Sequence, residues 1–116
     1  METIISLNNS MISLNAKTTV RASVIAQRTQ SDVMGIIKAQ MIETLKAQMI
    51  QGVAQFAFIK RDGSLREAWG TIQSNIANAK TNGRGENREQ YATYAFFDIE
   101  KGEWRSFRWE TLVKVF

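Results

Sequence analysis

The sequence predicts an α+β protein in which one or two N-terminal helices precede a small, partly open β-barrel of five strands. Six phenylalanines, two tyrosines and three tryptophans all lie at or after Phe56, so the aromatic residues are confined to the second half of the chain. Near Gly52 the hydrophobic period also changes from about four residues, typical of a helix, to about two, typical of a strand. A length of 116 residues fits a single domain.

Residues 1–30 are expected to form an N-terminal arm that is partly helical. In residues 1–15, Asn and Ser interrupt the apolar residues, and Glu2 stands where an export signal would carry a basic residue. Residues 16–28 contain several β-branched side chains, which leaves both a first helix and an extended segment open.

Residues 31–51 are predicted to form an amphipathic helix. Thr29 and Asp32 resemble a capping box, and Gly52 stands where a glycine often ends a helix. Apolar residues recur along the segment at intervals of four: Val33, Ile37, Met41, Leu45 and Met49.

This apolar stripe has two uses that the sequence leaves open. It packs either on the protein's own barrel or against a second copy of the chain. The candidate residues for an interface between copies are Ile37, Met41, Leu45 and Met49.

Residues 52–116 carry the strand signals. Asp62-Gly63 is a strong hairpin signal, Gly102 lies in a second turn, and residues 73–89 have the polar composition of a long loop. Residues 110–112 are short enough for a single 3₁₀ turn. The five expected strands cover residues 53–60, 64–72, 90–98, 103–109 and 112–116.

The composition excludes several kinds of chemistry. The chain has no cysteine and no histidine, which removes disulfides, thiolate nucleophiles, histidine acid–base catalysis and the common zinc sites. We therefore expect no enzyme, no metal and no cofactor. The net charge of +4 is a mild bias toward anionic partners. Since no apolar run approaches the roughly 20 residues that span a bilayer, we expect a soluble, cytoplasmic protein without a membrane partner.

Arginines and aromatic residues are interleaved near the C-terminus and on the second strand. Guanidinium groups beside flat rings would bind phosphates through charge-assisted hydrogen bonds and nucleobases by stacking. The candidate residues for binding a ligand or nucleic acid are Arg66, Trp69, Tyr94, Trp104, Arg105, Arg108 and Trp109.

Strand alternation favours a purely structural interpretation of the same residues. Alternation places Arg105 and Trp109 on the face of Phe107, which would point into the core, and Trp104 and Arg108 on the other face. The arginines would then pair with the acidic residues nearby, which are Glu67, Glu103 and Glu110.

A second basic segment lies in the expected long loop. Lys80, Arg84 and Arg88 alternate with glycines, so they are candidates for contacting a phosphate at the rim of a binding site. The loop matches no phosphate-binding motif, and a solvated linker is the favoured interpretation.

The C-terminal motif Arg105-x-Phe107-Arg108-x-Glu110-x-Leu112 resembles the R-x-F-R-x-[DE]-x-[IL] segment that ends WYL domains. Tyr94 and its neighbours fall where such domains carry their Trp-Tyr-Leu strand, although the literal tripeptide is absent. The runs FIKRDGSLREAWGTI and FFDIEKGEWRSF are similar to small bacterial and phage WYL-like proteins of SH3 or Sm-like fold. The resemblance covers about residues 50–116.

The resemblance implies a five-stranded SH3/Sm-like barrel over residues 52–116. It also implies binding of nucleic acids or nucleotide-like ligands, which WYL domains are thought to sense. We therefore expect a non-catalytic binding module for nucleic acid or a nucleotide-like anion, in a regulatory or phage–host role. The alternative is a protein–protein adaptor or a homo-oligomeric scaffold that assembles through the N-terminal helix.

Overall fold

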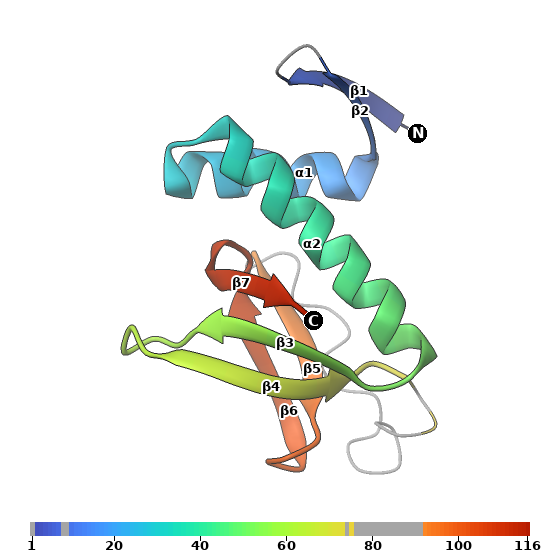
Figure 1. Ribbon diagram of the computed structural model, residues 1–116, viewed down its shortest axis with the longest axis vertical. Helices are drawn as coiled ribbons and strands as arrows, with labels where there is room; N and C mark the ends of the chain where they lie inside the picture. The colour runs from blue at the N-terminus through green and yellow to red at the C-terminus, as the bar shows by residue number, and fades with distance from the viewer. Residues whose placement is uncertain (1, 8–9, 74, 76–91) are drawn as a thin grey trace.

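Two helices lie on one side of a five-stranded antiparallel sheet, and a small hairpin lies beyond them (Figure 1). The computed structural model describes residues 2–7, 10–73, 75 and 92–116. No helix in these ranges is both long and apolar enough to cross a membrane. The elements are, in chain order, β1 (Glu2–Leu7), β2 (Ser10–Asn15), α1 (Ala16–Thr29), α2 (Asp32–Gln51), β3 (Ala54–Ile59), β4 (Leu65–Thr71), β5 (Thr93–Asp98), β6 (Glu103–Arg108), η2 (Trp109–Thr111) and β7 (Leu112–Val115).

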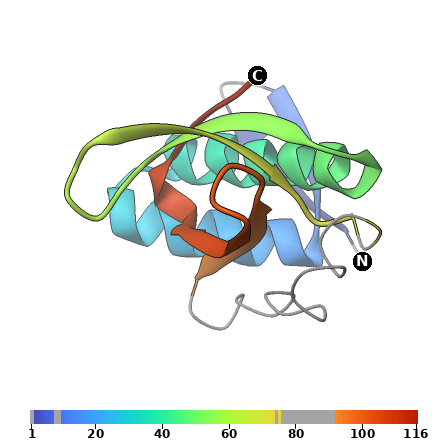
Figure 2. The same cartoon turned by 90° about the horizontal axis from the view of Figure 1, so that it is seen from below.

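The segment expected to be an arm contains the β1–β2 hairpin and helix α1. Residues 16–28, which the sequence left open, are helical because Asn15 provides a cap: its Oδ1 atom accepts the Thr18 N–H at 2.8 Å. Helix α1 ends at Gln30, whose φ of 56° places it in the left-handed region. The chain then turns directly into α2, and Figure 2 shows the two helices running side by side behind the strands.

Helix α2 begins one residue from the predicted start, with a different cap. The predicted capping box of Thr29 and Asp32 is wrong, because Thr29 is the last residue of α1 and its hydroxyl donates to the Ile25 carbonyl at 2.8 Å. The Ser31 hydroxyl instead accepts the Met34 N–H at 3.1 Å. Gly52 does end α2, but its φ of 171° is extended and not left-handed.

A glycine lets the two helices pack closely. A Cβ atom on Gly35 would collide with the Ala22 carbonyl oxygen and would lie 3.0 Å from the Ala26 Cβ atom. Because Gly35 has no side chain, the backbone of α2 approaches α1 at this point without strain.

The sheet has the strand order β6-β5-β4-β3-β7, and its neighbouring strands all pair in antiparallel fashion. Strands β3 to β6 follow one another as a meander, and β7 returns to pair with β3, with a bulge between Ala57 and Phe58. Each strand lies within three residues of its predicted range. Two helices followed by this sheet are consistent with the predicted α+β, SH3/Sm-like fold, whereas the predicted loop at residues 73–89 lies almost entirely outside the described residues.

One core connects α2 to the sheet. Its centre is a cluster of phenylalanines, in which the Phe56 and Phe96 rings meet edge to face at 4.9 Å and Phe58 stacks on Phe107 at 5.6 Å. From α2, three fully buried side chains pack on this cluster: Ile42, Leu45 and Met49.

The burial of α2 corrects part of the predicted interface between copies. Leu45 and Met49 are fully buried in the protein's own core, so a second copy cannot reach them. Ile37 is 41% exposed and Met41 is half-buried at the edge of the core, so both still lie at the surface.

Arg21 connects α1 to both α2 and the sheet. Its side chain is 1% exposed, and NH1 lies 2.8 Å from Glu43 Oε1 on α2. The guanidinium carbon also lies 5.6 Å from the centre of the Tyr94 ring and 6.0 Å from that of Trp109. These contacts allow a buried charge at the junction, because an acidic partner and two aromatic faces surround it.

Candidate anion-binding groove

A groove lined by basic residues lies between the β3–β4 turn and strand β6. It consists of two adjoining lobes, which share Phe58, Lys60, Arg61 and Ser106. We call these together the basic groove. The larger lobe has a volume of about 630 Å³ and extends toward Arg108 and η2, and the smaller has a volume of about 440 Å³. The smaller lobe is lined by five cationic side chains: Lys60, Arg61, Arg66, Lys101 and Arg105.

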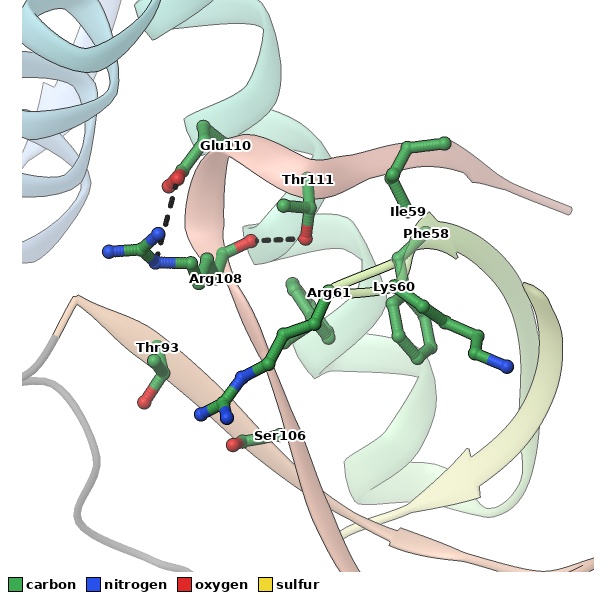
Figure 3. A pocket seen from close by; sticks show the side chains of 10 residues that line it. Phe58, Ile59, Lys60, Arg61, Thr93, Ser106, Arg108, Glu110 and Thr111 are labelled. Carbon is green, nitrogen blue, oxygen red and sulfur yellow. Dashed lines mark hydrogen bonds and ion pairs between the residues drawn. The ribbon is translucent and has the colours of Figure 1, made fainter. Parts of the chain in front are cut away.

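The β3–β4 turn presents Lys60 and Arg61. The Asp62 Oδ1 atom accepts hydrogen bonds from the Ser64 N–H at 2.9 Å and from the Ser64 hydroxyl at 2.6 Å. These bonds hold the pKa of Asp62 below its ordinary value and fix the turn. Gly63 takes a φ of 88°, which the turn requires. Figure 3 shows the Arg61 side chain reaching from this turn toward Ser106.

The β5–β6 turn presents Lys101 in the same way. The Asp98 Oδ1 atom accepts the backbone N–H groups of Glu100 and Lys101, each at 3.1 Å. The Gly102 N–H closes the turn on the Asp98 carbonyl at 2.8 Å. In an antiparallel meander, alternate turns lie at the same end of the sheet, so both basic turns face the same groove.

Asp98 also pairs with two of the three arginines of the smaller lobe, Arg66 and Arg105. Its side chain is fully buried, and Oδ2 lies 2.6 Å from Arg66 NH1 and 3.7 Å from Arg105 Nε. Burial of the carboxyl opposes its ionisation, but the hydrogen bond from Arg66 and those from the turn outweigh burial and hold the pKa of Asp98 below its ordinary value. Arg66 and Arg105 further contact Glu100 at 3.5 Å and Glu103 at 2.7 Å, respectively.

The larger lobe carries Arg108 at its far end. Arg108 is 64% exposed, and its Nε atom lies 3.8 Å from Glu110 Oε2 (Figure 3). Glu110 is already engaged, since its Oε1 atom lies 2.8 Å from Arg28 NH1 and its backbone carbonyl accepts a bond from Lys38 Nζ at 2.8 Å. Burial lowers the pKa of Lys38, although Glu110 partly opposes the change.

Three of the groove's cations, Lys60, Arg61 and Lys101, have no ion-pair partner in the part of the chain that the structure describes. Among the described residues that line the two lobes, Glu110 is the acidic one. The groove therefore carries an excess of positive charge, and an anionic group is the ligand that this charge favours.

The predicted arginines line the groove, but the predicted aromatic residues do not. Tyr94 and Trp109 are buried in the core, so their rings are not available to stack on a base. Trp104 packs edge to face on Phe97 at 5.9 Å. Trp69 is 44% exposed, but it alternates with buried residues and so lies on the outer face of the sheet. The expected platform of rings beside guanidinium groups is therefore wrong.

The predicted separation of Arg105 from Arg108 is partly right. The two side chains lie in different lobes, as alternation suggests, but Ser106, Phe107 and Arg108 all line the larger lobe. Strand β6 is an edge strand of the sheet, so side chains from both of its faces reach around the free edge.

Sequence reasoning missed Lys60, Arg61 and Lys101. The signal was present, since these residues lie at the two hairpin turns that the sequence predicts near Gly63 and Gly102. The predicted loop residues Lys80, Arg84 and Arg88 lie outside the described residues.

A family model described as WYL_2, Sm-like SH3 beta-barrel fold, matches residues 42–113. The chain belongs to the WYL_2 family. This confirms the predicted resemblance and covers β3 to β6, η2 and the second half of α2. The groove of this WYL_2 protein thus lies entirely within the segment that matches the family.

The chain is also similar to a protein of Enterobacteria phage T4, described as an uncharacterized 11.5 kDa protein in the Gp31-cd intergenic region. The two are 30% identical over 81 residues, which cover 67% of this chain and 79% of the phage protein. No solved structure matches the chain significantly.

Proposed function

We propose that this WYL_2 protein is a non-catalytic binding module whose basic groove binds nucleic acid or a nucleotide-like anion. The observation that carries the proposal is the convergence of Lys60, Arg61 and Lys101, unpaired within the described residues, from two turns onto one groove. Arg66 and Arg105 lie behind them and Arg108 lies beside them.

Phosphate is the anionic group that best suits these side chains. Arginine donates two parallel hydrogen bonds to a phosphate, and lysine adds a mobile positive charge. The rings that line the groove, those of Phe58 and Phe107, are almost fully buried, which leaves little surface for a base to stack on. Binding should therefore depend on the backbone phosphates, with strong salt dependence and little preference for base sequence.

We further infer that the sheet curls into a partly open barrel over residues 52–116 and that the groove lies at its opening. The strand order leaves β6 and β7 as the two edges of the sheet, and the groove follows β6. A regulatory or phage–host role is in keeping with the similarity to a phage protein.

Fluorescence anisotropy with labelled single-stranded, double-stranded and cyclic oligonucleotides tests the proposal. At about 50 mM salt, where a phosphate-driven site binds most strongly, we expect binding that weakens steeply as salt is raised. The triple variant Lys60→Ala/Arg61→Ala/Lys101→Ala should lose at least about tenfold in affinity, since each phosphate contact adds to the salt-dependent part of binding.

A matched control distinguishes the effect of the groove residues from the effect of the protein's overall charge. The triple variant Lys17→Ala/Lys46→Ala/Lys114→Ala removes the same amount of positive charge from residues that do not line the two lobes. It should lose much less affinity than the groove variant. Equal losses in both variants, or no binding by the wild-type protein at this salt concentration, would contradict the proposal.

A second candidate function is an adaptor or homo-oligomeric scaffold. A shallow apolar surface lies between α2 and β7, where Ile37, Met41, Val113 and Val115 gather. Light scattering tests this candidate, because an oligomer assembled through α2 should become a monomer in Ile37→Asp. A wild-type protein that is already a monomer at high concentration excludes assembly with its own copies.

A further inference from the structure

We propose that Asp98 is the positioning residue of the basic groove, holding Arg66, Arg105 and Lys101 in the arrangement that binds phosphate. The inference rests on the proposed function, because it concerns how the same groove recognises its ligand. Asp98 itself would not touch the ligand, since it is fully buried and does not line either lobe.

The geometry assigns a separate task to each oxygen of the Asp98 carboxylate. Oδ2 lies 2.6 Å from Arg66 NH1 and 3.7 Å from Arg105 Nε. Oδ1 accepts the N–H groups of Glu100 and Lys101 at 3.1 Å each, which shapes the turn that carries Lys101. Three of the five cations of the smaller lobe therefore depend on one buried side chain.

Ordering the arginines in advance favours binding. A long cationic side chain loses rotational freedom when it binds a ligand, and a partner that has already fixed it removes part of this cost. Arg66 has five N–H donors and contacts Asp98 and Glu100 through two of its nitrogens, so donors are left for a phosphate.

Two physical accounts of Asp98 predict opposite results for the same substitution. If only charge matters, Asp98→Asn removes a negative charge beside an anion site and tightens binding. If Asp98 positions the cations, the same change weakens binding, because an amide cannot form the ion pair with Arg66.

Asp62 provides a matched control for the charge. It lies within the β3–β4 turn, where its Oδ1 atom accepts the Ser64 N–H at 2.9 Å, and it forms no ion pair with an arginine among the described residues. Asp62→Asn removes the same charge next to the groove, and the amide oxygen can still accept the two Ser64 hydrogen bonds that fix the turn, so Lys60 and Arg61 keep their places.

The experiment measures anisotropy of a labelled single-stranded oligonucleotide of about 20 nucleotides at about 50 mM salt. We expect Asp98→Asn to bind about tenfold more weakly than wild type, the effect of losing one well-placed charged contact. Asp62→Asn should bind at least as tightly as wild type. Binding by Asp98→Asn that equals or exceeds wild type overturns the inference.

A second variant covers the case in which Asp98→Asn does not fold, as judged by circular dichroism. Arg66→Lys keeps the positive charge but loses the planar fork that Asp98 holds, so it should bind at least about threefold more weakly than wild type. Wild-type affinity in Arg66→Lys overturns the inference while leaving the proposed function intact. Failure of the wild-type protein itself to bind overturns both.

Discussion

The carboxylate of Asp98, the last residue of β5, contacts two of the arginines that line the groove. It is fully buried, and an unpaired carboxylate in that position would be costly, so Arg66 and two backbone N–H groups surround it. The contribution of this arrangement to the free energy of unfolding depends on pH, because protonation of Asp98 removes its ion pair.

We expect Asp98 to contribute to resistance against acid. Because folding lowers its pKa below the value of about 3.9 in an unfolded chain, its stabilisation is fully present above about pH 4. The stabilisation is lost as pH falls through the lowered pKa of the folded state. Asp98→Asn should reduce the free energy of unfolding at pH 7 by about 3 kcal/mol, as expected for breaking a buried pair. Urea unfolding at a series of pH values should show the wild type and the variant converging toward pH 3. A constant difference at every pH would rule out this role.

Half of the cations that line the groove were candidates from the sequence. Arg66, Arg105 and Arg108 were among them, whereas Lys60, Arg61 and Lys101 were not. The aromatic candidates Tyr94 and Trp109 failed, because alternation says which residues share a face of a strand but not which face is covered. Here the helices cover the face that carries them, and Arg21, distant in sequence, occupies the position beside both rings.

At the scale of the elements, the contact between α1 and α2 depends on the absence of a side chain. Gly35 lies where the two helices meet, and a Cβ atom there would meet the backbone of Ala22, which cannot move aside as a flexible side chain would. The chain therefore keeps a residue of poor helix propensity within α2.

Gly35→Ala should destabilise the protein although alanine favours helix by about 1 kcal/mol. The clash forces α1 and α2 apart, and overpacking of this kind typically costs about 1–3 kcal/mol. Gly52→Ala is the control, because Gly52 has an extended φ of 171° and open space around its Cβ position. Thermal unfolding should show a lower midpoint for the first variant and little change for the second. A midpoint unchanged by Gly35→Ala would mean that the helices tolerate a wider separation.

Helix α2 and the strands that follow Gly52 could be predicted to within three residues, because the change of hydrophobic period near Gly52 follows directly from helix and strand geometry. The β1–β2 hairpin was not predicted, and residues 16–28 were left open between a helix and an extended segment. The exact boundaries of the helices could not be predicted. Ser31, rather than Thr29, caps α2, and this depends on Gln30 taking a left-handed conformation that no glycine or asparagine announces.

At the scale of the whole molecule, the core does not stop at the boundary between helix and sheet. Leu45 and Met49 belong to the same cluster as Phe56 and Phe107, and Thr71 of β4 places its hydroxyl 2.6 Å from the Gly52 carbonyl at the end of α2. The sequence could not decide between this packing and an interface between copies, since a stripe of apolar residues does not reveal what covers it.

Leu45→Ala should therefore weaken the helices and the sheet together. We expect a loss of about 3 kcal/mol, the usual cost of a fully buried leucine, while the exposed Ile37→Ala should change stability by less than about 0.5 kcal/mol. Far-ultraviolet circular dichroism reports mainly on the helices and tryptophan fluorescence on the sheet. The two signals should follow one shared transition, and two separate transitions would indicate that helices and sheet unfold independently.

The position of β6 at the edge of the sheet has a consequence for the ligand. Among the described strands, β6 is hydrogen-bonded to β5 alone, whereas the opposite wall begins in β3, which is held on both sides. One wall can thus shift by small amounts at little cost while the other stays fixed. Such a site would accommodate anions of differing width rather than select a single shape.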